Sequence, residues 1–97
     1  MKKASLVTHV TKGSVFDDPA LFPPDRVVDL KMRAQLLRGL EAWLQTAGTQ
    51  AAAAKVLGVT QARVSDIKRG MIDKFSLDLL VRLAVRAGLH PQLKMAA

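Results

Sequence analysis

The chain has 97 residues and a formal net charge of +7 at pH 7, which leaves room for one small domain and favours a polyanionic partner. It contains no cysteine, which excludes disulfide bonds and thiolate metal sites. No apolar run approaches the roughly 20 residues of a membrane span. The N-terminus lacks the continuous apolar region of a signal peptide, so we expect a cytoplasmic protein without membrane contact.

Residues 1–23 show no sustained hydrophobic period, and their prolines prevent a long helix. We therefore expect an N-terminal arm that precedes the folded domain. Three large apolar side chains stand in this short segment: Val15, Phe16 and Phe22. Two interpretations stay open, because the arm can either cover its own domain or bind a protein partner through these side chains and order on binding.

A long helix is predicted from Pro24 to about Thr46, since proline suits a first helical turn and Asp25 suits its positive end. Apolar residues fall on one side of this helix, and we expect Trp43 to lie in the core. Gly39 weakens a helix interior, which suggests that another helix passes close to it.

The stretch 50–70 predicts two short helices joined by a tight turn. Alanines at 51–54 favour the first helix, and Gly58 stands where a left-handed residue would end it. Thr49 suits the N-cap of the first helix, and Thr60 suits that of the second, which runs from Gln61 to Arg69 and ends at Gly70. The apolar residues expected to join the two helices are Ala53, Leu57, Val59, Val64 and Ile67.

A last helix is predicted to begin after the N-cap Ser76 and to end at Gly88. Val81 and Val85 lie beside its buried stripe, and they are either dimer contacts or core residues. The charged residues expected on its outward face are Asp78, Arg82 and Arg86. The tail, residues 89–97, alternates apolar and polar residues and could form a short strand. We thus divide the chain into an arm (1–23), a domain (24–88, with the motif at 50–70) and a tail.

A polar, net basic face on the second short helix is typical of a DNA-reading helix-turn-helix. The predicted base contacts are Gln61, Ala62, Ser65 and Asp66. For Asp66, an ion pair with Arg63 or Arg69 is the alternative. The predicted phosphate contacts are Thr49, Gln50, Arg63, Lys68, Arg69 and Lys74. We expect double-stranded DNA as the partner.

Enzymatic activity is not expected. The two histidines, His9 and His90, lie at opposite ends of the chain, and neither a nucleophile-elbow pattern nor a glycine-rich phosphate loop is present. We therefore predict no catalytic residue, no metal site and no cofactor.

The spacing Gln50…Ala54…Gly58-Val59…Val64…Ile67, with the pairs Thr49-Gln50 and Thr60-Gln61, resembles the Xre/Cro family of phage-repressor-like DNA-binding proteins. The runs VFDD…PPDRVVDLKMRAQL and DIKRGMIDKFSLDLLVRLAVRAGL resemble its HigA-type subgroup, the antitoxins of type II toxin–antitoxin modules. The match covers roughly Val15 to Met95 of the 97 residues.

The resemblance implies an all-α, lambda-repressor-like fold of about five helices around the helix-turn-helix. It also implies a homodimer on a palindromic operator, a tail that pairs with a partner chain, neutralisation of a small basic RelE/HigB-type toxin, and repression of the protein's own operon. Two alternatives stay open. One is a stand-alone phage-type or metabolic repressor without a toxin, and the other is an interaction module that has lost DNA binding, for which Asp66 is the only support.

Overall fold

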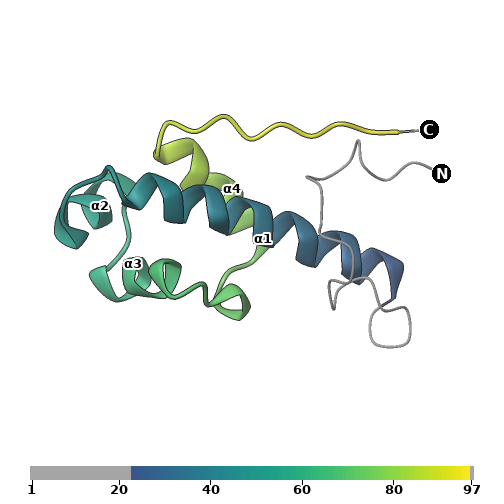
Figure 1. Cartoon of the computed structure of the whole chain (residues 1–97), viewed down its shortest axis with the longest axis horizontal. Helices are drawn as coiled ribbons and strands as arrows, with labels where there is room; N and C mark the ends of the chain where they lie inside the picture. The colour runs from purple at the N-terminus through teal and green to yellow at the C-terminus, as the bar shows by residue number, and fades with distance from the viewer. Residues whose placement is uncertain (1–22, 97) are drawn as a thin grey trace.

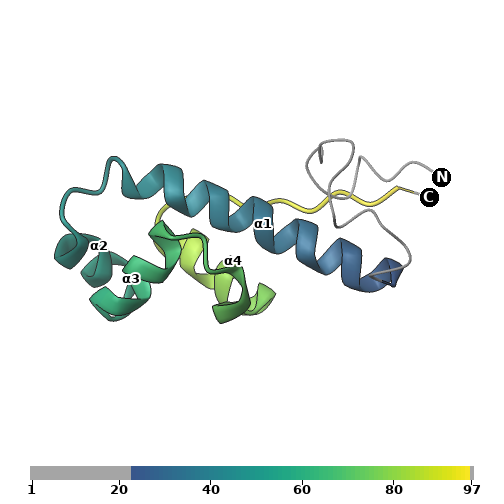
Figure 2. The ribbon, with the colours of Figure 1, turned by 60° about the horizontal axis from the view of Figure 1, so that its bottom comes forward.

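The computed structural model describes residues 23–96, which contain α-helices and one 3₁₀ turn but no strand. The elements are α1 (Pro24–Leu44), α2 (Gln50–Leu57), α3 (Gln61–Lys68), η2 (Ile72–Lys74) and α4 (Leu77–Arg86). The longest helix is α1, and the other helices pack along it. The pair α2 and α3 lies at its C-terminal end, and α4 packs against it (Figures 1 and 2). This arrangement confirms the predicted all-α fold, with four α-helices in the described part.

The predicted N-caps of the three shorter helices are confirmed. Thr49, Thr60 and Ser76 have extended backbones, and each side-chain oxygen accepts a hydrogen bond from the backbone N–H three residues later. All three bonds are 3.1 Å long. Each cap satisfies one of the N–H groups that a helix start leaves without a partner inside the helix.

The turn between α2 and α3 depends on Gly58, whose φ of 70° and ψ of 35° are left-handed, as predicted. Its N–H donates to the carbonyl of Ala54 at 2.8 Å and ends the helix. Nη1 of Arg86, from α4, donates to the carbonyl of Leu57 at 2.9 Å. Arg86 is exposed, as expected, and its guanidinium in addition holds the C-terminal end of α2.

The core joins all the helices. Its main cluster of buried residues is Leu37, Leu40, Leu57, Ile67, Phe75, Leu80 and Leu83. A second cluster, made of Ala53, Ala54 and Val64, fills the crossing between α2 and α3. Trp43 packs against both clusters, which confirms its predicted place. The small Ala54 is buried where the two helices approach each other, so a longer side chain there would separate them.

Arg33 connects α1 to the segment before α4. Its Nε donates to Asp29 Oδ1 at 3.1 Å, and its Nη1 donates to the carbonyl of Phe75 at 3.2 Å. The hydrogen bond from Arg33 lowers the pKa of Asp29 below its ordinary value, although partial burial acts in the other direction. The same pairing raises the pKa of Arg33.

Two expectations about α1 are corrected. The helix ends at Leu44 rather than near Thr46, and the chain then turns through Gly48, which has a φ of 87°. Gly39 is exposed, and a Cβ there would meet only Leu89 Cδ1 at 3.9 Å, an ordinary contact. Among residues 23–96, no other helix comes within 4 Å of such a Cβ, and the neighbour is the start of the tail.

The tail over residues 89–96 contains neither helix nor strand and runs along α1 in both views (Figures 1 and 2). The predicted short strand is absent from these described residues. An isolated extended segment has no neighbouring strand to supply ladder hydrogen bonds. None of the helices in residues 23–96 is long and apolar enough to cross a membrane.

Candidate nucleic-acid interface

The orientation of α3 is fixed by two apolar side chains on its inner face. Val64 and Ile67, three residues apart, are both fully buried. The opposite face consequently points to solvent. The exposed residues on it are Gln61, Ala62, Lys68 and Arg69, and Ser65 is half-buried beside them. The structure thus brings most of the predicted contact residues of the second helix onto one accessible surface, which we call the α3 face.

The N-terminal end of the α3 face is open. Gln61 is exposed, and its side chain forms no hydrogen bond within the described residues. Its amide can donate and accept at once, which matches N6 and N7 of adenine in the major groove. Ala62 next to it presents a methyl group of the kind that contacts the thymine methyl.

Asp66 does not belong to this open surface. The residue is 8% exposed, and its Oδ1 lies 2.9 Å from Arg69 Nη2 while its Oδ2 lies 3.7 Å from Arg63 Nη1. Both carboxylate oxygens are therefore engaged by arginines. The ion pair that was the alternative for Asp66 is therefore present in the structure, and the base contact at Asp66 stays a prediction.

Arg63 is largely engaged inside the domain. Its Nη1 donates to the carbonyl of Lys74 at 3.2 Å, and its guanidinium carbon lies 5.4 Å from the ring centroid of Phe75. This cation–π contact and the hydrogen bond fasten α3 to the segment before α4. Arg63 thus has a structural task besides the phosphate contact predicted for it, a task that local sequence spacing could not reveal.

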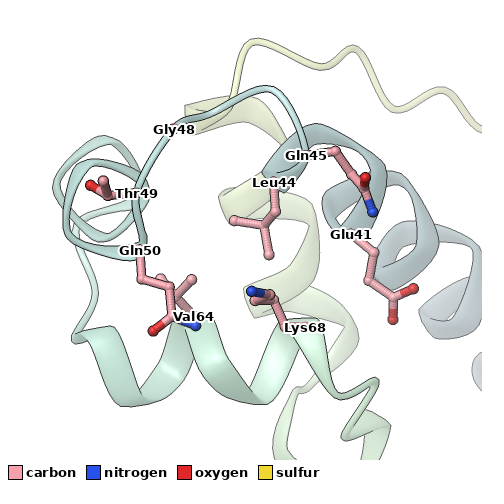
Figure 3. A pocket seen from close by; sticks show the side chains of 8 residues that line it. All are labelled: Glu41, Leu44, Gln45, Gly48, Thr49, Gln50, Val64 and Lys68. Atoms are coloured by element: carbon pink, nitrogen blue, oxygen red, sulfur yellow. The ribbon is translucent and has the colours of Figure 1, made fainter.

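A hollow of about 290 Å³ lies between the C-terminal end of α1, the start of α2 and the side of α3. In Figure 3, Gln50 extends from the start of α2 toward Val64, and Lys68 points into the same space from α3. Thr49 stands at the rim, where its hydroxyl caps α2. Three predicted phosphate contacts therefore meet at one place.

Glu41 also lines this hollow, and the sequence reasoning missed it. Its carboxylate belongs to α1, far away in sequence, and nothing in the motif at 50–70 signals its presence. An anion at the mouth of the hollow would meet the ammonium group of Lys68 on one side and this carboxylate on the other. The negative charge of Glu41 therefore lowers the affinity of the hollow for an anion inside it. The rim of the hollow is the more favourable place for a phosphate oxygen.

The remaining predicted residues lie elsewhere. Val81 and Val85 are 38% and 59% exposed, which excludes them from the core of the chain and leaves the dimer contact as a prediction. Lys74 is exposed at the end of η2. Val15, Phe16 and Phe22 lie outside the described residues. Within residues 23–96, no group of three or more histidines, cysteines, aspartates or glutamates could hold a metal ion.

A protein-family model described as a helix-turn-helix domain matches residues 15–96. The matched range includes every described helix, from α1 to α4, and most of the tail. No curated protein gives a significant match. The family match agrees with the capped pair α2 and α3 and supports a DNA-binding regulator.

Proposed function

The chain belongs to this helix-turn-helix domain family, and from that membership we propose that it is a sequence-specific regulator that places α3 in the major groove of operator DNA. One observation carries the proposal. The buried side of α3 carries Val64 and Ile67, and its N-terminal end exposes Gln61 and Ala62, whose side chains have no hydrogen-bond partner among residues 23–96. In this motif the N-terminal residues of the second helix contact base edges.

The proposed interface divides into two kinds of contact. Gln61, Ala62 and Ser65 read base edges, whereas Thr49, Gln50 and Lys68 at the rim of the hollow bind phosphate oxygens, as does Lys74. Contacts to phosphate position a protein on the duplex, and contacts to bases specify the sequence. The net charge of +7 supports the phosphate contacts.

We also propose that the protein binds as a homodimer to an inverted repeat. Exposed apolar side chains on α4, Val81 and Val85, support a dimer contact. Beside Val81 lies a second hollow of about 280 Å³ between α1, α4 and the tail. Its lining residues are Met32, Gln35, Leu36, Leu77, Val81, Pro91, Gln92 and Leu93. A two-fold dimer would place its two α3 helices about 34–36 Å apart, one turn of DNA.

A DNase footprint on the region upstream of the protein's own gene tests this proposal. The expected result is one protected inverted repeat whose half-sites are separated by about one helical turn, roughly 10 base pairs. A matched experiment with Gln61→Ala should shrink or remove that protection at equal protein concentration. Uniform cleavage of the upstream region by DNase at saturating protein would contradict binding to an operator of its own.

The finer proposal is an antitoxin that neutralises a RelE/HigB-type toxin and represses its own operon in the cytoplasm. The resemblance of residues 15–95 to HigA-type antitoxins supports it, and the apolar residues Val15, Phe16 and Phe22 are the proposed toxin contacts. The test is co-expression with a small basic reading frame beside the gene. The full chain should relieve growth arrest and co-purify with that product.

A variant that lacks residues 1–23 should lose the co-purification and still bind DNA. If it keeps the toxin, the arm is not the binding segment. A gene without any toxin-sized neighbour would favour the stand-alone repressor. The third interpretation, an interaction module without DNA binding, rests on Asp66 alone, whose carboxylate is paired with Arg63 and Arg69. Absence of binding to any DNA would favour it.

A further inference from the structure

Viewed along the helix axis, Arg69 lies near the centre of the α3 face, and along that axis it is the C-cap residue directly after Lys68. Successive residues of a helix are rotated by about 100°, so the order of side chains around the exposed side is Gln61, Ser65, Arg69 and Ala62. Arg69 therefore falls between Ser65 and Ala62, directly opposite the buried Val64 and Ile67. Its side chain is 61% exposed. Arg69 therefore projects from the same exposed side of α3 as Gln61, Ser65 and Ala62, at the C-terminal end of that side.

The orientation of Arg69 is fixed by Asp66. Arg69 Nη2 donates to Asp66 Oδ1 at 2.9 Å, and the side chain of Asp66 is only 12% exposed. The other oxygen of Asp66 faces Arg63, whose guanidinium is held by the carbonyl of Lys74 and the ring of Phe75. The carboxylate of Asp66 is thus held in place by Arg63, and it in turn restricts the rotation of the Arg69 side chain.

The pairing also selects the kind of group that Arg69 can bind. A carboxylate in direct contact offsets much of the guanidinium charge, which lowers its attraction for a phosphate. It leaves the donor fork intact, since a guanidinium has five N–H groups and the bond to Asp66 uses one. A fixed fork with reduced net charge suits a neutral pair of acceptors better than a phosphate, and O6 and N7 of guanine are such a pair.

We propose that Arg69 reads a guanine in each operator half-site and that Asp66 is the positioning residue that aims its guanidinium. This inference rests on the proposed DNA-binding function. It moves Arg69 from the predicted phosphate contacts to the base contacts. Arg63, the other partner of Asp66, is excluded from this role because its guanidinium lies over the Phe75 ring.

The experiment measures the affinity of the full-length protein for its footprinted operator and for every single-base-pair variant of one half-site. The wild-type protein should prefer guanine at one position, at the end of the contact that faces the C-terminus of α3, by about 10- to 100-fold. Arg69→Ala should lose this preference at that position only. Arg69→Lys, which keeps the charge but not the fork, should lose most of it.

Asp66→Asn tests the positioning role. It should reduce the preference for guanine at the same position several-fold while affinity for random DNA does not fall, because one negative charge is removed. Thermal melting checks that this variant folds. If Asp66→Asn does not fold, Arg69→Lys still shows whether the preference for guanine depends on the donor fork of the guanidinium.

Arg26→Ala is the matched control. Arg26 forms an ion pair of the same three-residue spacing with Asp29, and its side chain is 46% exposed. It belongs to the first turn of α1, and that end of α1 lies away from α3 (Figure 1). Its removal should leave every base preference unchanged. If Arg69→Ala instead weakens all sequences equally and reduces the salt slope by about one, Arg69 is a phosphate contact and the inference is overturned. A wild-type protein without any base preference would overturn the proposed function itself.

Discussion

The replacement Gly58→Val should distort the joint between the two helices of the motif. Gly58 has a left-handed backbone, with φ 70° and ψ 35°, at the end of α2. A Cβ at this position would lie 3.4 Å from Arg86 Nη1, the group that donates to the carbonyl of Leu57 at 2.9 Å. Valine therefore brings both an unfavourable backbone and a crowded neighbour.

The magnitude follows from these two effects. A left-handed conformation costs an L-residue about 1–2 kcal/mol, and a β-branched side chain makes it worse. Loss of the hydrogen bond from the charged Arg86 adds up to about 1.5–3 kcal/mol. Gly58→Val should therefore lower the free energy of unfolding by about 2–5 kcal/mol. In a domain of this size, the melting temperature should fall by at least about 10 °C.

Thermal and urea unfolding, followed by circular dichroism and by Trp43 fluorescence, measure this effect. Gly58→Ala separates the two contributions, since alanine carries the backbone cost with the smallest side chain. Gly39→Ala is the matched control, because a Cβ there meets only Leu89 Cδ1 at 3.9 Å within a regular helix. That control should raise stability by about 0.5–1 kcal/mol. A Gly58→Val protein with the wild-type melting temperature would refute the assigned turn.

Three more predictions concern base reading, pH and assembly. Gln61→Ala should reduce discrimination at one or two base pairs by about 1–3 kcal/mol in competition binding, and an unchanged preference would show that another residue reads them. Because Arg33 lowers the pKa of Asp29 below 3.8, the stability that Asp29 contributes is present above that pH and is lost as pH falls through the lowered pKa. Urea titrations should therefore show the gap between wild type and Asp29→Asn closing only in acid; a gap independent of pH would exclude the pairing in solution. Val85→Lys should give monomers in light scattering, whereas the control Val56→Lys, at a valine that is similarly exposed (53%), should stay dimeric. If both variants are dimers, the dimer interface does not include Val85.

Local features of the fold were predictable from sequence because their causes are local. Thr49, Thr60 and Ser76 cap helices whose first turns begin immediately after them. Gly58 and Gly70 take positive φ at helix ends, where only glycine does so without strain. The exposed face of α3 followed in the same way, since the spacing of Val64 and Ile67 decides which side is buried.

The contacts of the arginines were not predictable. Arg86 reaches Leu57 across 29 positions, and Arg33 reaches Phe75 across 42. The sequence around a backbone carbonyl does not indicate which distant arginine side chain will donate a hydrogen bond to it. For the same reason the pairing at Asp66 stayed one of two alternatives until the geometry placed Arg69 and Arg63 beside it.

Errors at Gly39 and in the tail have another origin. A glycine inside a helix suggests close packing, but Gly39 is exposed, and a Cβ there would meet Leu89 of the tail at 3.9 Å. The alternating pattern of the tail is compatible with a short strand, yet residues 89–96 have no neighbouring strand within the described part of the chain. Both expectations required knowledge of what lies next to the segment, which its own sequence does not contain.

Sequence-specific DNA binding is tested most directly by a gel-shift titration of the protein on its upstream DNA and on random DNA, at two salt concentrations. We expect at least about 10³-fold tighter binding to the upstream DNA. Affinity should fall steeply with salt, with a slope near −0.9 for each phosphate contacted. Equal and weak binding to both DNAs at low salt would contradict the assignment of α3 as a helix that reads its own operator.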